Sequence, residues 1–290
     1  MTIQITQDEV VTRAAGLPSF PRVITEILAS LDDPETNLNV LTDFITHDPV
    51  IAARVLSFAN RAAERTRSIG SVRDIYTATS LIGMGRIREI ALVSSLGHFV
   101  GSSLPEGTPL SYWQHSVAVG VCAQELAIHI DAPVSSDSAL IAGLLHDIGQ
   151  LWFYRFQKDT YKLVRHEAHN QGVGIEAAER KHYSVDHSQI GGWLAEHWAL
   201  PAGITAAIAH HHDPEAALDD LLVPVVAIAE VLSNALDLTE RAENQVTHVS
   251  IAACMKLDLA FDSSVQPLFG RIEARSRHAN SMFSSESPHF

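Results

Sequence analysis

Apolar residues recur every three or four positions along most of this chain. Residues 22–31 give one example, in which the apolar side chains at helical spacing are Val23, Ile24, Ile27, Leu28 and Leu31. This spacing places apolar side chains along one face of an α-helix. No stretch alternates apolar and polar residues for long enough to indicate a β-sheet. The sequence therefore predicts an all-α fold.

The same spacing, read together with the prolines and glycines, predicts the extent of each helix. Residues 1–16 form a short lead-in with some helical character. After it we expect helices over residues 22–31, 37–46, 50–60, 75–81, 86–96, 111–130, 136–156, 158–170, 174–183, 187–198, 201–212 and 222–236. The break at residues 83–85 contains two glycines and two nearby arginines. It is typical of a plain turn between helices, and less typical of an anion-binding hairpin.

Residues 101–110 are rich in proline, glycine and serine, which is typical of a loop between subdomains. We therefore expect an N-terminal helical subdomain over residues 1–105 and a helical bundle over residues 106–262. Residues 263–290 are expected to form a C-terminal tail, and residues 281–290 are rich in serine as in a frayed end.

Charge and cysteine content narrow the functional classes. The chain has 290 residues and a formal net charge of -14, with 34 acidic against 20 basic residues. This balance makes binding along a nucleic-acid backbone an unlikely function, because such binding relies on clustered lysines and arginines. Cys122 and Cys254 are the only cysteines, which excludes a disulfide framework and fits a reducing compartment.

The start of the chain lacks a basic segment followed by an apolar core, so no signal peptide is expected. The apolar run over residues 221–232 is too short to span a bilayer and contains Glu230. We therefore expect a cytoplasmic protein that does not enter a membrane.

Residues 143–150, Gly-Leu-Leu-His-Asp-Ile-Gly-Gln, follow an apolar helix and place an imidazole next to a carboxylate. A buried carboxylate is costly unless it is paired, hydrogen-bonded or bound to a metal. Adjacent side chains on a helix diverge by about 100°, so His146 and Asp147 could serve one cation or two neighbouring cations. A local cap with a satisfied core histidine is the alternative. That alternative is the better interpretation of His47 and Asp48, which precede Pro49 at the start of a helix.

Further histidines give the pair at 146–147 a possible metal-binding context. His115, His187 and the run His210, His211 and His212 each lie near a predicted helix end. Imidazole and carboxylate ligands from several helices form mononuclear or binuclear sites suited to Fe, Mn, Zn, Ni or Co. The histidine run could equally be surface polarity at a helix C-terminus, where a cationic imidazole suits the helix dipole.

Several short motifs together resemble the HDOD family, a family of bacterial all-helical signalling modules related to HD and HD-GYP phosphohydrolases. They occur in order over about residues 10–235: Leu-Pro at 17–18, Asp-Pro at 48–49 before a helix ending in Ala-Asn at 59–60, Ile-Gly-Ser-Val at 69–72, Trp-Gln-His-Ser at 113–116, Gly-Leu-Leu-His-Asp-Ile-Gly at 143–149, Glu-His-Trp-Ala-Leu-Pro at 196–201 and His-His-Asp-Pro at 211–214. The resemblance implies an N-terminal helical subdomain packed on an HD-like helical bundle. It also implies a regulatory module without demonstrated catalysis.

By the same resemblance, an HD-type centre of one or two divalent metal ions would use His115, His146, Asp147, His187, His211 and His212. Its last acidic ligand would be Glu230, where aspartate is the more usual residue. Two departures weigh against catalysis. Gln150 stands where catalytic relatives commonly have a phosphate-contacting lysine, and no Gly-Tyr-Pro loop follows the paired histidines.

Two functions follow from this sequence. The first is a signalling module that acts through contacts with other signalling proteins. The second is a metal-dependent phosphohydrolase acting on a phosphate-containing small molecule, with Asp147 as its essential carboxylate and Gln150 as a weak phosphate contact. An effector that docks a nucleotide or nucleic acid near residues 83–88 is a weaker third interpretation.

Overall fold

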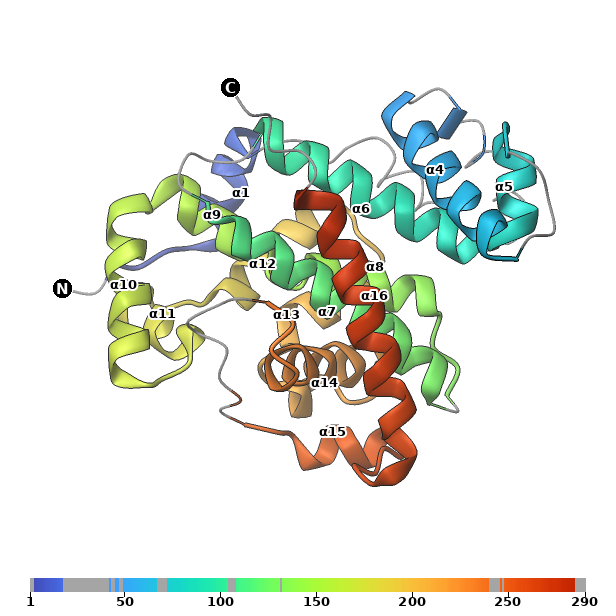
Figure 1. Ribbon diagram of the computed structural model, residues 1–290. Helices are drawn as coiled ribbons and strands as arrows, with labels where there is room; N and C mark the ends of the chain where they lie inside the picture. The colour runs from blue at the N-terminus through green and yellow to red at the C-terminus, as the bar shows by residue number, and fades with distance from the viewer. Residues whose placement is uncertain are drawn as a thin grey trace. The chain divides into compact units, whose positions relative to one another are not determined.

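The computed structural model describes residues 3–17, 42, 45–46, 49–66, 72–103, 108–130, 132–239, 246 and 248–284. Every regular element within these residues is a helix and none is a strand, which confirms the all-α prediction (Figure 1). The predicted helix over residues 22–31, most of the helix over 37–46, and the pair His47 and Asp48 lie outside the described residues.

The chain divides into two compact units. One unit comprises residues 19–103, and the other combines residues 1–18 with residues 104–290. Residues 1–18 join the larger unit because α1 (Gln7–Arg13) packs on α12 (His187–His197). The backbone N–H of Ile3 also donates to the carbonyl oxygen of His182 at 2.8 Å.

The smaller unit contains α4 (Pro49–Thr66), α5 (Ile75–Ile82) and α6 (Met84–Ser103). The Asn60 side chain joins α4 to the segment before α5, because it bonds both the N–H and the carbonyl of Val72. Asp74 caps α5 by accepting from the N–H of Thr77 at 2.8 Å. Helix α6 continues through residues 101–103, where we expected a loop. The first proline after the start of α6 is Pro105. A proline disfavours helical geometry at the residue directly before it, so residues 101–103 can remain helical.

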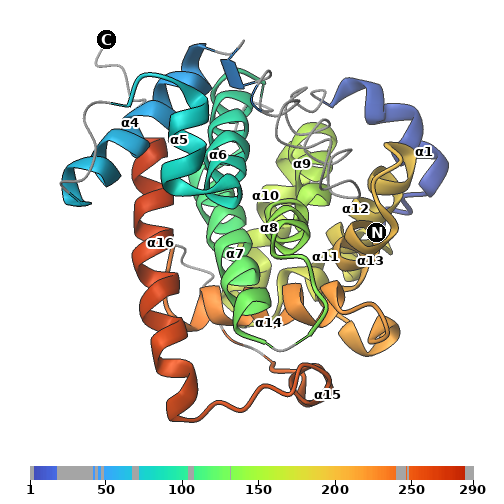
Figure 2. The same cartoon turned by 90° about the vertical axis from the view of Figure 1, so that its right-hand side faces the viewer.

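The larger unit is built around α7 (Leu110–His129), nearly all of which is buried. Helices α8 (Ser136–Leu145), α14 (Leu222–Ala235) and α16 (Gln266–Ser284) pack on it (Figure 2). Two glycines allow α7 and α8 to approach each other closely. A Cβ atom added to Gly143 would lie 2.8 Å from the Cα atom of Gly120, closer than two packed carbon atoms can approach.

The helix predicted over residues 136–156 is in fact two helices, α8 and α9 (Ile148–Phe156). They meet at His146 and Asp147, and Asp147 leaves the helical geometry with φ -91° and ψ 11°. Packing explains the break. A Cβ atom at Gly149 would lie 2.0 Å from the carbonyl oxygen of His187, so the chain turns here to place α9 tightly against α12.

The remaining helices of the larger unit surround the ends of these elements. They are α10 (Lys158–Gln171), α11 (Ile175–Tyr183), α13 (Ala202–His210) and α15 (Ile251–Lys256), with short 3₁₀ turns η1 (Ala14–Gly16), η2 (Pro214–Ala217) and η3 (Ser263–Val265). Among the described helices, none combines the length and the apolar character needed to cross a membrane.

The stretch 263–290 is not simply a tail, as we had expected, because residues 266–284 form α16. Leu268, Ile272 and Ala279 are buried at helical spacing along it. Arg271 and Arg275 of α16 both donate to the carboxylate of Glu125 on α7. Apolar burial and these ion pairs together hold α16 against α7.

Candidate metal centre

All seven residues predicted as metal ligands lie at one place in the larger unit, near the ends of several helices. They are His115 in the second turn of α7, His146 and Asp147 between α8 and α9, His187 at the first position of α12, His211 and His212 after α13, and Glu230 in α14. Separate helices and the turns that join them thus bring one or two side chains each to the same centre. We call these seven residues the metal centre.

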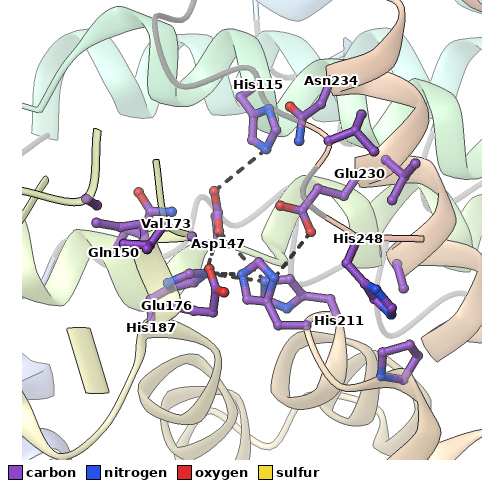
Figure 3. Close-up of a pocket in the computed structure, with 18 of the residues that line it drawn as sticks. His115, Asp147, Gln150, Val173, Glu176, His187, His211, Glu230, Asn234 and His248 are labelled. Atoms are coloured by element: carbon purple, nitrogen blue, oxygen red, sulfur yellow. Dashed lines mark hydrogen bonds and ion pairs between the residues drawn. The ribbon is translucent and has the colours of Figure 1, made fainter. Parts of the chain in front are cut away.

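The carboxylate of Asp147 lies in the middle of the metal centre (Figure 3). Its Oδ1 atom is 3.1 Å from Nε2 of His187 and 3.9 Å from Nε2 of His211. Its Oδ2 atom is 3.5 Å from Nε2 of His146 and 3.9 Å from Nε2 of His115. Four imidazoles from four different segments therefore face one buried carboxylate.

Asp147 does not act as a helix cap, although it occupies the N-cap position of α9. Its side chain makes no capping hydrogen bond there. Asp186 shows the contrast, because it caps α12 by accepting from the N–H of Gln189 at 2.8 Å. The local interpretation of the His-Asp pair as a simple cap therefore fails for residue 147.

Hydrogen bonds outside the centre fix the orientation of three imidazoles. Nδ1 of His146 donates to the Gly143 carbonyl at 2.7 Å, and Nδ1 of His211 donates to the Ile208 carbonyl at 2.8 Å. Nδ1 of His187 lies 2.6 Å from the carboxylate of Glu179. A neutral imidazole that donates through Nδ1 carries its lone pair on Nε2. The Nε2 atoms of the three rings face one another and the Asp147 carboxylate, an arrangement that a cation between them would stabilise.

The second part of the centre involves His212 and Glu230. Nε2 of His212 is 2.9 Å from Nε2 of His187, and its Nδ1 is 3.7 Å from the Glu230 carboxylate. Three sets of ligand atoms lie within 4.8 Å of one another: His187 with His211 and His212, His115 with His146 and Asp147, and His146 with His211 and Glu230. Overlapping sets of this kind fit one or two ions of N/O-binding divalent metals.

The electrostatics also suit a cation. Burial by itself raises the pKa of the Asp147 carboxyl, but His146, His187 and His115 hold that pKa well below its usual value. Burial lowers the pKa of His211, and the neighbouring imidazoles of His212 and His146 lower it further. The carboxylate is thus ionised and this imidazole neutral, which are the protonation states that bind metals.

Glu179 belongs to this site, although the sequence did not indicate it. One carboxylate oxygen accepts from both the backbone N–H and Nδ1 of His187, and the other accepts from the Tyr161 hydroxyl at 2.8 Å. Burial raises the pKa of Glu179, and the His187 and Tyr161 interactions oppose this effect. A carboxylate behind a histidine in this way fixes its ring and raises its basicity as a ligand.

The signal for Glu179 was present but weak. It lies four residues before the buried Tyr183 on α11, on the face that also buries Ala178. A glutamate on the apolar face of an amphipathic helix needs a polar partner, and only the folded structure identifies that partner as His187.

A cavity of about 200 Å³ opens from the metal centre. Residues of α9, α10, α11 and α14, of the turn between α10 and α11, and of the segment before α15 line it in addition to the centre itself. Among them are Gln150, Arg165, His169, Val173, Glu176, Val231, Asn234 and His248. The metal centre is therefore closed by protein on one side and open to a ligand on the other.

A comparison with protein families identifies the fold family of the chain. The model of the HDOD domain matches residues 17–214, which is more than half of the chain. The chain belongs to the HDOD family. The match includes the metal-centre residues from His115 to His212 and ends before Glu230.

Related proteins extend the HDOD comparison. A protein of Treponema pallidum (strain Nichols), named "Uncharacterized protein", is 25% identical over 233 residues, which cover 78% of this chain and 44% of that protein. This HDOD chain thus spans less than half the length of that curated relative.

Solved structures show the same fold. An HDOD domain protein of unknown function from Geobacter sulfurreducens gives a TM-score of 0.75 at 21% identity, covering 94% of this chain and 99% of the other. A "Putative phosphohydrolase" from Shewanella amazonensis SB2B gives a TM-score of 0.66 at 22% identity, covering 94% of this chain and 96% of the other. A "Putative signal transduction protein" from Marinobacter aquaeolei VT8 gives a TM-score of 0.72 at 22% identity, covering 97% of this chain and 62% of the other. At identities of 21–22%, these structures show that the HDOD chain shares their fold.

The hairpin at residues 83–88 is an ordinary turn in this HDOD chain. Gly83 ends α5 with φ +80°, and α6 begins at the next residue. Arg86 contacts the Glu89 carboxylate at 2.5 Å, and its guanidinium lies 4.9 Å from the ring centre of Phe58. These intramolecular contacts favour the helix–helix turn over an anion-binding hairpin.

Proposed function

We propose that this chain is a regulatory signalling module that holds one or two divalent transition-metal ions in the metal centre and binds a phosphate-containing small molecule next to them. One observation carries the proposal. The Nε2 atoms of four imidazoles face the buried Asp147 carboxylate, and this centre is open on one side to the cavity. Structural metal sites are closed by protein ligands, whereas sites that bind a further ligand keep an open position.

The residues of the metal centre would hold the ions, and Fe, Mn, Zn, Ni and Co are the metals that such ligands suit. Bound there, the metal would supply Lewis-acid positions for phosphate oxygen atoms. Glu179 keeps the Nε2 atom of His187 directed at Asp147. Other signalling proteins would then respond to the occupied module.

Hydrolysis of the bound phosphate ester is a second candidate function. It is favoured by the same open side, since an attacking water molecule needs access to the centre. The residue at position 150 weighs against hydrolysis, because Gln150 lines the cavity but lacks the positive charge that a lysine would offer to a phosphate. The cavity is smaller than the roughly 300–1,000 Å³ of pockets for drug-sized ligands, so either function is expected to involve a compact ligand.

Metal analysis combined with a substrate panel tests both functions. The wild-type protein and Asp147→Ala are prepared without oxygen, and bound metals are measured by mass spectrometry. Asp159→Ala is the matched control, because Asp159 is exposed on α10 and lies outside the cavity lining. We expect metal in the wild type and the control and its loss in Asp147→Ala.

The two functions differ in turnover. All three proteins are assayed against phosphomonoesters and phosphodiesters in the presence of Mn²⁺. No turnover together with saturable phosphate binding supports the regulatory function. Turnover by the wild type that Asp147→Ala abolishes would replace it with the phosphohydrolase. Wild-type protein without bound metal would overturn both.

A further inference from the structure

The cavity next to the metal centre has an unusual charge distribution. Asp147, Glu176 and Glu230 line it as carboxylates. Among the described residues of the lining, Arg165 is the only lysine or arginine. Gln150, which lines the same cavity from α9, is 5% exposed and uncharged. Any permanent positive charge that these lining residues offer to a ligand therefore comes from Arg165.

The guanidinium of Arg165 is held in place by Tyr154 of α9. Its Nη1 atom donates to the Tyr154 hydroxyl at 2.6 Å, and its Cζ atom lies 5.6 Å from the centre of the ring. Tyr154 follows Gln150 by four residues, so both side chains lie on one face of α9. Tyr154 thus holds the guanidinium on the face of α9 that carries Gln150.

The same wall is connected to the metal centre. Tyr161 precedes Arg165 by one turn of α10, and its hydroxyl donates to Glu179, which orients His187. The rings of Tyr154 and Tyr161 pack edge to face, with centres 5.1 Å apart. Arg165 therefore stands on a packed aromatic wall that continues to a predicted metal ligand.

We propose that Arg165 binds a phosphate oxygen of the ligand held at the metal centre, and so supplies the positive charge that Gln150 lacks. This inference rests on the proposed function. A guanidinium presents parallel N–H donors that match two oxygens of one phosphate group. Preorganisation by Tyr154 reduces the side-chain entropy that binding would otherwise lose.

Calorimetric titration of the Mn²⁺-loaded protein with inorganic phosphate tests this role. We expect Arg165→Gln to bind phosphate about ten- to a hundredfold more weakly, as when a charge-assisted hydrogen bond is lost. Its Mn²⁺ stoichiometry should stay that of the wild type. Lys162→Gln is the matched control, because Lys162 is exposed on the same helix and does not line the cavity.

A rescue experiment separates charge from packing. In the double variant Arg165→Gln with Gln150→Lys, the new lysine restores a cation to the same face of α9, so most of the lost phosphate affinity should return. A double variant that binds no better than Arg165→Gln would overturn the proposal, since the loss would then reflect packing on Tyr154.

Two further outcomes would also overturn it. In the first, Arg165→Gln binds phosphate as tightly as the wild type. In the second, Arg165→Gln loses Mn²⁺ together with phosphate, which would make the role of Arg165 structural. Both leave the proposed function intact, because the wild type still binds metal and phosphate. A metal-loaded wild type that binds no phosphate would instead overturn the proposed function and the role of Arg165 with it.

Discussion

Three imidazoles of the metal centre depend on a neighbour outside the centre for their orientation. Backbone carbonyls orient His146 and His211, and no side-chain substitution removes such a carbonyl. His187 instead depends on the side chain of Glu179. The orientation of the His187 ring can therefore be tested by a single substitution that leaves all seven predicted ligands in place.

We predict that Glu179→Gln weakens metal binding by about ten- to a hundredfold, the range found when a carboxylate behind a metal-bound histidine is removed. The physical reason is that the neutral amide holds the His187 ring less firmly and makes it less basic. Competition with a fluorescent chelator measures the affinity. Glu167→Gln, which affects a surface carboxylate near Lys181 and His182, should bind metal like the wild type. An unchanged affinity in Glu179→Gln would contradict this role.

Residue types alone predicted which side chains would form the metal centre, but not which neighbours would orient them. The histidines at 115, 187, 211 and 212 distinguished the His-Asp pair at 146–147 from the pair at 47–48. Glu179 could not be predicted in this way, because it lies in the strongly charged sequence Glu-Ala-Ala-Glu-Arg-Lys-His, where glutamates usually face solvent. Its partner is identified only by tertiary contact.

At the scale of helices, two close approaches position the site. Gly143 brings α8 onto α7, and Gly149 brings α9 onto α12. The second approach lies two residues from Asp147 and directly at the backbone of His187. Any side chain at position 149 must therefore separate the two elements that carry the middle of the metal centre.

Gly149→Ala is expected to lower the free energy of unfolding by about 1–3 kcal/mol or more, as when a packed interface is overfilled. It should also reduce metal binding, because the added Cβ atom displaces the backbone of His187. Urea denaturation and metal analysis give the two readouts. Gly270→Ala is the control, since no heavy atom lies within 4 Å of a Cβ atom there. Equal stability of Gly149→Ala and the wild type would show that the approach is looser than described.

Glu125 makes the attachment of α16 to α7 dependent on pH. Burial raises the pKa of Glu125, but Arg275 and Arg271 lower it more, so its pKa in the folded protein is below the usual value. The stabilisation is therefore complete above the pKa of the unfolded chain, about 4.3, and is lost as the pH falls through the folded pKa. Glu125→Gln lacks this titration.

We expect Glu125→Gln to be less stable than the wild type at pH 7 by about 1–3 kcal/mol, toward the lower end because Arg271 is partly exposed and solvent screens its charge. The difference should shrink as the pH falls below about 4 and through the lowered folded pKa, where the wild-type carboxyl becomes protonated as well. Urea unfolding at a series of pH values measures it. Glu273→Gln, at an exposed position on α16, should follow the wild-type profile. A difference that does not vary with pH would rule out the ion pair as its cause.

Helical periodicity predicted most elements of the larger unit to within a few residues, because amphipathic segments such as α10 and α12 face a single core. It missed the break at His146 and Asp147. The apolar pattern continues across both residues, and the close contact at Gly149 that requires the break involves a helix forty residues later. It also missed α16, in which the buried Leu268, Ile272 and Ala279 are separated by several charged and polar residues.

At the scale of the whole molecule, the seven predicted ligands span residues 115–230 and join segments that are distant in the sequence. The unfolded chain offers no such assembly, so metal binding favours the folded state. The described part of the smaller unit contributes none of these ligands.

Addition of Mn²⁺ should therefore raise the thermal midpoint of the metal-free protein. At a free metal concentration of about 100 times Kd the stabilisation is about 2.7 kcal/mol, which corresponds to about 5–10 °C for a unit of this size. Calorimetry with and without EDTA measures the shift, and Asp147→Ala should show none. An equal rise in Asp147→Ala would place the stabilising ion elsewhere.

The attachment of α1 to α12 has a consequence for synthesis of the chain. Residues 19–103 leave the ribosome as one continuous piece and can pack as soon as they emerge. Helix α1 is made before residues 19–103 but contacts a helix about 180 residues later, which at about 5–20 residues per second is a delay of about 10–40 s. During that interval the buried side of α1, with Val10 at its centre, is exposed. Helix α1 thus docks only after α12 has formed, and until then its apolar side is available to chaperones.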